Sequence, residues 1–243
     1  MPRFFERIFS GKKQKEEVEI PLSKGELYDV QTERIIKRVC KKSSNCIDIG
    51  ANVGDVLNII SKYAPDGTHY VFEPIPDLYE NLASAYKDTT CKIFELALSD
   101  TKGVSSFNYV ISNPAYSGLI KRRYDREEEE DTLIQVKTDL LDDVLPKNHP
   151  VHLIKIDVEG GELPVMRGAI NTIKKWKPVI VFEHGLGSSE FYGTTPEKLY
   201  ALLNDCGLEV YTLTNWLDKN KPLTINELRQ LFDSNEEYYF VAS

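Results

Sequence analysis

Short apolar runs alternate with segments of helical periodicity along most of the chain, and this alternation constrains the fold more than any other feature. An apolar run of about four to eight residues, bounded by Gly, Pro or Asp, is typical of a buried strand. Strands joined by helices lie parallel in one sheet, because the helix carries the chain back to the start of the next strand. We therefore predict an α/β fold with a mostly parallel sheet and helices on both faces.

The expected elements follow this pattern. Strands are predicted at residues 45–49, 69–73, 92–98, 151–157, 179–183, 208–213 and 238–242, helices at 26–41, 56–63, 77–86, 164–175 and 196–206, and an antiparallel pair at 103–110 and 132–138. Ligands bind such sheets beyond the carboxyl ends of the strands, near the point where the strand order reverses. The residues that follow each strand are therefore the first to inspect for a site.

The first 24 residues stand apart from this pattern. Phe4, Phe5, Ile8 and Phe9 fall at helical spacing, and residues 1–15 carry five basic residues against one acidic residue. We predict a basic amphipathic extension over residues 1–24, followed by one domain over residues 25–243. The extension could lie on an anionic membrane surface, or it could be a frayed terminus or a helix packed on the domain.

Composition excludes several classes of protein. A hydrophobic content of 41% is enough for a core, and no apolar stretch approaches the roughly 18 residues of a membrane span. The net charge of −8 argues against a nucleic-acid partner. The four cysteines form no Cys-x-x-Cys pair, so we predict no metal site. We expect the cysteines to be free thiols in the cytoplasm. Any membrane contact, through the N-terminal extension, is expected to be peripheral and at the inner face of the membrane.

The segment after the first strand has the composition of a ligand-binding loop. It reads Asp-Ile-Gly-Ala-Asn-Val-Gly (48–54), and its glycines allow a tight turn before a helix whose free amides face the ligand. A dinucleotide fingerprint needs a second glycine where Asn52 stands, which weakens a pyrophosphate interpretation. Asp48 would repel a phosphate and would suit a cationic group.

A second acid follows the next strand. Glu73 lies 25 residues after Asp48, at a place where a carboxylate can accept both hydroxyls of a ribose. Two acids at adjacent strand ends, with a glycine loop, favour a nucleoside that carries a sulfonium, namely S-adenosylmethionine. The alternative is a purely structural role, in which each acid caps a helix or lies in a solvated loop.

Four motifs together resemble the FkbM family of class I S-adenosylmethionine-dependent methyltransferases. They are residues 48–54, Val-Phe-Glu-Pro (71–74), Ala-Leu-Ser-Asp (97–100) and Ile-Asp-Val-Glu-Gly-Gly-Glu (156–162), and the match runs from about residue 30 to the C-terminus. Gly161 stands where the family more often has Ala. The resemblance implies a Rossmann-like sheet of seven strands with the last antiparallel, and methylation of hydroxyl groups.

The resemblance also implies positions along the cofactor. The methionine end would lie against Asp48, Gly50, Ala51, Asn52 and Gly54, the ribose against Glu73 and Pro74, the adenine against Leu98 and Ser99, and the amino group or the transferred methyl against Asp157.

The chemistry needs a group that removes the proton of the attacking hydroxyl. Asp157, Glu159 and His184 all follow strand ends, and we predict that they surround the methyl, with Glu159 or His184 as the base. His184 could instead be a loop histidine bonded to its neighbours. Glu162 reads as an acid in the first turn of a helix. The three close acids could also hold a divalent cation, although we predict none.

The acceptor is expected to lie under residues 111–131, a long turn-rich segment. Its basic residues 121–123 could meet a phosphate or a carboxylate, or could balance the acids at 127–131. The prediction is an O-methyltransferase of a hydroxylated glycan or small natural product. A nicotinamide-dependent oxidoreductase and a catalytically inactive cofactor-binding scaffold remain alternatives.

Overall fold

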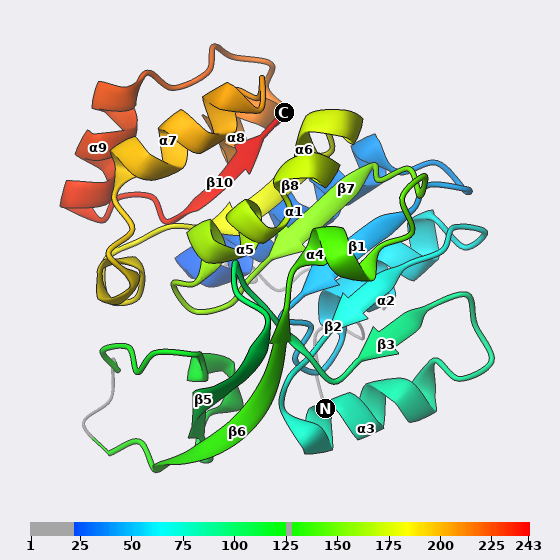
Figure 1. Ribbon diagram of the computed structural model, residues 1–243. Helices are drawn as coiled ribbons and strands as arrows, with labels where there is room; N and C mark the ends of the chain where they lie inside the picture. Colours follow the sequence, from blue (N-terminus) through cyan, green and yellow to red (C-terminus); the bar gives the residue numbers. More distant parts are fainter. Residues whose placement is uncertain (1–21, 125–127) are drawn as a thin grey trace, which may run out of the picture.

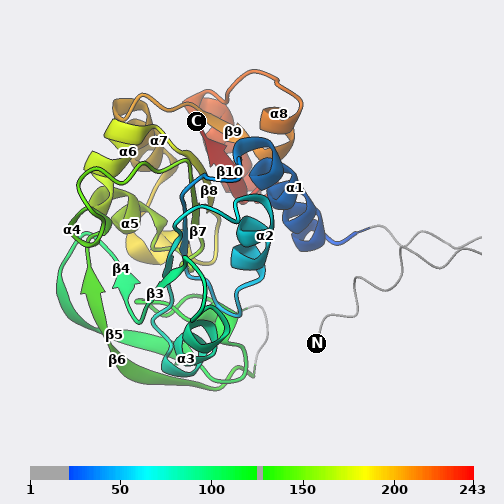
Figure 2. The same cartoon turned by 90° about the vertical axis from the view of Figure 1, so that its right-hand side faces the viewer.

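The computed structural model describes residues 22–124 and 128–243, and it holds a seven-stranded sheet with helices on both faces (Figures 1 and 2). The strands lie in the order β3-β2-β1-β7-β8-β10-β9, and β10 runs antiparallel to both of its neighbours. The strands are β1 (Cys46–Ile49), β2 (Tyr70–Phe72), β3 (Lys92–Phe94), β7 (Leu153–Ile156), β8 (Val179–Glu183), β9 (Val210–Thr212) and β10 (Tyr239–Ala242). The predicted α/β class, the parallel core and the antiparallel last strand are confirmed.

The helices cover the two faces of this sheet as separate layers (Figure 2). One layer holds α1 (Lys24–Val39), α2 (Asp55–Tyr63), α3 (Pro76–Ala85) and α8 (Leu213–Leu217). The other holds α4 (Leu141–Val144), α5 (Glu162–Gly168), α6 (Ile170–Trp176), α7 (Pro196–Asp205) and α9 (Ile225–Ser234). We call these the α1 face and the α5 face.

Strand residues alternate between these two faces. In β1, Cys46 packs in the core of the α1 face, whereas Ile47 and Ile49 pack in the core of the α5 face. The same alternation places Asp48 and its register partner Lys155 on the α1 face. An acid and a base therefore lie buried on one face at the centre of the sheet.

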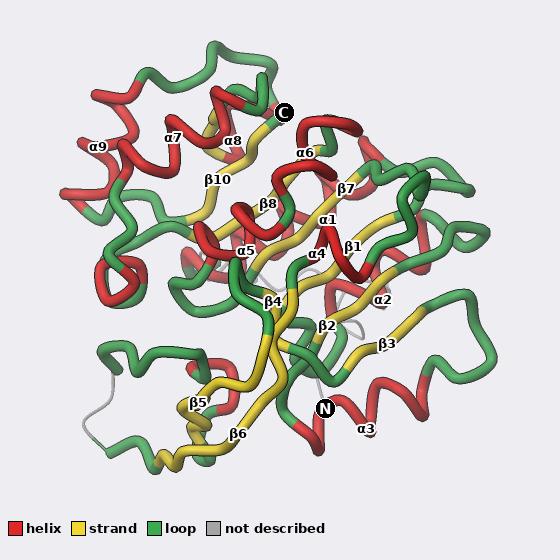
Figure 3. The backbone as a smooth tube through the Cα atoms, in the orientation of Figure 1, coloured by secondary structure: helices red, strands yellow, loops and turns green. Residues whose placement is uncertain are grey.

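A second, three-stranded sheet projects from the main sheet (Figure 3). It holds β4 (Ala97–Leu98), β5 (Gly103–Val110) and β6 (Asp131–Asp139), and the short 3₁₀ helix η2 (Pro114–Tyr116) follows β5. We call residues 103–124 and 128–139 the arm. The predicted antiparallel pairing of 103–110 with 132–138 is confirmed. The predicted strand 92–98 is wrong as one unit, because Ala97 and Leu98 leave the main sheet to pair with β6.

Other boundaries differ for local reasons. The predicted helix 164–175 is two helices that meet at Ala169. The first helix begins at Lys24, earlier than predicted, because Ser23 and Glu26 form a capping box at its start. A second capping box, between Thr224 and Glu227, opens α9, which the apolar pattern did not predict.

The predicted extension falls almost wholly on residues 1–21, outside the described part of the chain, so its amphipathic character and its membrane contact stay predictions. Within residues 22–124 and 128–243, no helix combines the length and the apolar character that a membrane crossing needs.

Candidate active site

A cavity opens at the carboxyl ends of β1, β2 and β7. The strand order reverses between β1 and β7, which makes this the topological switch point of the sheet. About 730 Å³ of empty space lies within the lining of the cavity, a figure that includes the part open to solvent. Seven of the predicted site residues line it: Gly50, Asn52, Glu73, Pro74, Leu98, Asp157 and Glu159.

Gly50 brings the first loop into close contact with the end of β7. A β-carbon at this position would lie 1.8 Å from the backbone oxygen of Asp157, and the φ of Gly50 is +77°. Its N–H group donates a hydrogen bond of 2.9 Å to the carbonyl of Phe72. Glycine alone has no β-carbon to clash with Asp157 and adopts this positive φ without strain, so Gly50 fixes the floor of the cavity.

Glu73 joins the first loop to the second. Its carboxylate accepts hydrogen bonds from the backbone N–H groups of Asn52 (2.8 Å) and Ile75 (2.9 Å), and the residue is 3% exposed. Burial raises the pKa of Glu73 to about 6. Each oxygen keeps a lone pair for a further donor, so the group is a fixed acceptor on the cavity wall.

Two hydrogen-bond donors on the α1 face fix the carboxylate of Asp157. Its Oδ2 accepts a hydrogen bond of 2.9 Å from the ammonium of Lys155 and another from the hydroxyl of Tyr239.

Asp48 lies on the same face, 2% exposed, and burial raises its pKa to about 7. No hydrogen-bond partner for Oδ2 of Asp48 is found among the described residues.

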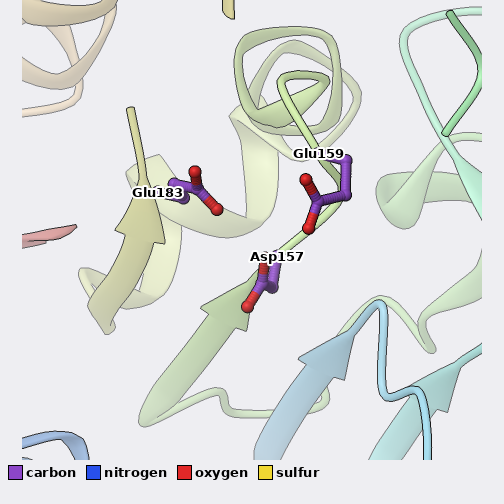
Figure 4. Close-up of side chains that lie close together, drawn as sticks. All are labelled: Asp157, Glu159 and Glu183. Carbon is purple, nitrogen blue, oxygen red and sulfur yellow. The ribbon is translucent and has the colours of Figure 1, made fainter. Parts of the chain in front are cut away.

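Three carboxylates gather where β7 and β8 end, as Figure 4 shows. One oxygen each of Asp157, Glu159 and Glu183 lie within 4.8 Å of one another. Burial, followed by the charge of Asp157, raises the pKa of Glu183 to about 8. Such a cluster attracts cations, whether a metal ion or a positively charged group of a ligand. Glu183 was not among the predicted site residues.

Glu159 already has a cationic partner. The guanidinium of Arg122, which comes from the arm, forms an ion pair with its carboxylate, and the two side chains are only 10% and 12% exposed. Glu159 also adopts a positive φ of +57°, which turns its side chain out of the strand direction.

Glu162 has the structural role that the sequence predicts. It is the first residue of α5, and its Oε1 accepts hydrogen bonds of 3.2 Å from the N–H groups of Val158 and Gly160. It holds the loop that carries Glu159 and does not line the cavity.

His184 does not reach the cavity. It is fully buried on the α5 face, stacked on Phe232 at 4.7 Å, with Nδ1 3.2 Å from the hydroxyl of Ser189. Burial lowers its pKa to about 4, which keeps the ring neutral. Because neighbouring strand residues alternate sides, Glu183 turns toward the carboxylate cluster and His184 turns away from it.

Four further predicted residues support the site without lining it. Asp48 lies within β1, whereas Ala51 packs in the core with Leu57. Gly54 starts α2 with a φ of +89°, and the N–H group of Ser99 donates to the carbonyl of Asp139.

The arm supplies one wall of the cavity. Phe107, Pro114, Ala115, Ser117 and Leu119 line it, as does Tyr192 from the 3₁₀ helix η3 (Ser189–Tyr192). The hydroxyl of Tyr192 accepts a hydrogen bond of 2.9 Å from the N–H group of Ile120, which ties the arm to the loop after β8. The sequence pointed to residues 111–131 as a cover, but carried no signal for Phe107 or Tyr192.

Comparison with known proteins identifies the family. The sequence model of the methyltransferase FkbM domain matches residues 48–210, more than half of the chain. The chain belongs to the FkbM methyltransferase family. The resemblance that the four motifs indicated is confirmed, and a nicotinamide-dependent oxidoreductase is set aside. This FkbM methyltransferase uses S-adenosylmethionine as its cofactor.

Individual relatives agree with this assignment. Methyltransferase sdnD of Sordaria araneosa is 26% identical over 196 residues, which are 68% of this chain and 73% of that protein. The crystal structure of a methyltransferase FkbM from Methylobacillus flagellatus has a TM-score of 0.51 at 14% identity. That likeness covers 84% of this FkbM methyltransferase and only 44% of the other chain, and it shows the shared fold.

Proposed function

We propose that this FkbM methyltransferase transfers a methyl group to a hydroxyl of a glycan or a small natural product. The observation that carries the proposal is the position of the Glu159 carboxylate, which lines the same cavity as Glu73 and Asp157. An alcohol is a weak nucleophile, so its proton must move to a base as its oxygen attacks.

The lining of the cavity fits S-adenosylmethionine. Glu73 presents a carboxylate, already fixed by two backbone N–H groups, that can accept the ribose hydroxyls. Ile75, Leu98 and Phe107 give an apolar surface for the adenine. Asp157 and Glu159 line the same cavity, and a carboxylate there would favour a cationic sulfonium.

We assign the proton transfer to Glu159 in preference to His184, because His184 is buried on the α5 face. When bound, S-adenosylmethionine would supply a methyl group on a positively charged sulfur, which would leave with the bonding electron pair. Glu159 would take the proton of the acceptor hydroxyl as its oxygen attacks that methyl group. Asp157, held by Lys155 and Tyr239, positions the cationic end.

Turnover assays test this proposal. The full chain should form S-adenosylhomocysteine with hydroxylated acceptors and not with amines of the same skeleton. Glu159→Gln should lower turnover by about 10²–10⁴-fold and leave cofactor affinity close to wild type. Faster methylation of the amine, or normal turnover in Glu159→Gln, would contradict the proposal. Cofactor binding without turnover on any acceptor would support the inactive scaffold instead.

A further inference from the structure

Two guanidinium groups of the arm lie close together against Gly187, and one of them pairs with the cavity residue Glu159. Nη2 of Arg123 and Nη2 of Arg122 lie 3.4 Å and 3.9 Å from the position that a β-carbon on Gly187 would occupy. The backbone fixes this arrangement, because the N–H group of Arg123 donates a hydrogen bond of 3.0 Å to the carbonyl of Gly187. Both guanidinium groups therefore pack against Gly187, in the loop that follows β8, and lie close to each other there.

The acids nearby leave one of these charges unbalanced. Arg122 pairs with Glu159, and Lys121 pairs with Asp131. Within residues 22–124 and 128–243, no carboxylate lies within ion-pair distance of the Arg123 guanidinium. Both oxygens of Glu190 accept from the N–H group of Gly187, at 2.8 Å and 2.9 Å. Arg123 is thus an exposed cation that no described acid neutralises.

The side chain of Arg122, next to Arg123, is held in place by two contacts. The guanidinium of Arg122 lies 4.9 Å from the ring centroid of Tyr116, which itself stacks on Tyr124. Its Nη1 holds Glu159 while its Nη2 lies against Gly187, beside Arg123. One planar cation therefore connects the proposed base to the neighbourhood of the exposed Arg123.

We propose that the neighbouring guanidinium groups of Arg122 and Arg123 bind a phosphate or carboxylate group of the acceptor, with the exposed Arg123, which no described acid neutralises, making the main contact. Two guanidinium groups are suited to planar or tetrahedral oxyanions, because their N–H donors match the spacing of the oxygens. The inference rests on the proposed function and narrows it: the acceptor is an anionic molecule whose charged group lies a few bonds from the hydroxyl that is methylated.

This site also couples binding to chemistry. An arginine that holds a carboxylate stabilises its ionised form and makes it a weaker base. An acceptor anion competes for Arg122 and loosens its ion pair with Glu159. The anion therefore raises the basicity of Glu159 at the moment when the hydroxyl is in place, so losing the anion lowers turnover as well as affinity.

Binding of methyl phosphate and of acetate to the full chain, measured by calorimetry with the cofactor present, tests the site. Arg123→Gln should weaken binding of the better of the two anions at least tenfold, because it removes a charge-assisted contact. Lys121→Gln, a change in the same segment, should change it less than threefold. Both variants should keep wild-type cofactor affinity, which shows that they are folded. Equal anion affinity in Arg123→Gln and wild type, or no binding of either anion to wild type, would overturn the inference.

A second measurement addresses the coupling. With a hydroxylated sugar, its 6-phosphate and its uronic acid as acceptors, the anionic forms should have the higher kcat. Arg122→Gln should remove that difference. A neutral sugar that turns over as fast as its charged forms would contradict the inference and leave the proposed O-methylation intact. Anion binding with no methylation of any hydroxyl would contradict the proposed function alone.

Discussion

The ammonium of Lys155 lies 2.9 Å from Oδ2 of Asp157, and its side chain is 4% exposed. Lys155 is also the register partner of Asp48 across β1 and β7. A single buried cation therefore compensates two acids, one inside the sheet and one at the edge of the cavity.

Replacing this cation should destabilise the fold. Lys155→Met removes the partner of a buried charge, which costs about 3–5 kcal/mol in fully buried cases, and less is expected here because Asp157 is 31% exposed. The loss should grow with pH, because Lys155 restrains the raised pKa of Asp48. Urea denaturation at pH 6 and pH 8 measures it, and Asp48→Asn in the same chain should recover part of the loss. Wild-type stability in Lys155→Met would refute this account.

Glu183 should make stability depend on pH. Its pKa is raised to about 8 by burial, so folding favours the protonated form. The stability that it contributes is complete below about pH 4 and is lost as pH rises through about 8. Glu183→Gln should therefore gain about 2 kcal/mol or more on wild type between pH 5 and pH 9. The exposed Glu236→Gln serves as the control, and an equal gain in both variants would exclude this role.

Gly50→Ala should disrupt the site. Its β-carbon would lie 1.8 Å from the Asp157 carbonyl at a φ of +77°, so the first loop or the end of β7 must move. We expect a loss of about 2 kcal/mol or more, together with loss of cofactor binding. Gly25→Ala is the matched control, because nothing lies within 4 Å of its β-carbon and α1 tolerates Ala there. Thermal denaturation of the two variants decides the matter.

Glu73→Ala should weaken S-adenosylmethionine binding. It removes the proposed ribose acceptor, and hydrogen bonds to a charged group contribute about 1.5–3 kcal/mol each. At least a tenfold rise in Kd is expected by calorimetry. Glu73→Gln keeps one carbonyl oxygen and should lose less. Unchanged affinity in Glu73→Ala would remove this residue from the cofactor site.

His184→Asn should separate a structural role from a catalytic one. The ring is buried against Phe232, so the substitution should lower the thermal midpoint. Turnover per folded molecule should stay near wild type, because the ring does not line the cavity. A fall of 10²-fold in turnover with an unchanged midpoint would restore His184 as the base.

Local sequence was enough to predict most strands of the main sheet and the loop after β1. The alternation of apolar runs and helices predicted the sheet. Gly50, Asn52 and Glu73 line one cavity, and their shared position at the strand ends could be predicted because a tight turn and a strand-end acid leave contiguous signals. The capping boxes at Ser23 and Thr224 are local patterns of two residues as well, but the prediction from apolar spacing missed both helix starts.

Only the tertiary structure decided which side chains meet. Arg122 reaches Glu159 from 37 residues away because the arm folds back over the strand ends, and Lys155 meets Asp157 and Tyr239 because β7 and β10 present them on one face. His184 was misplaced because proximity to a strand end does not say to which face a side chain turns. Pairing across a sheet depends on register and on long loops, which a sequence read one segment at a time does not specify.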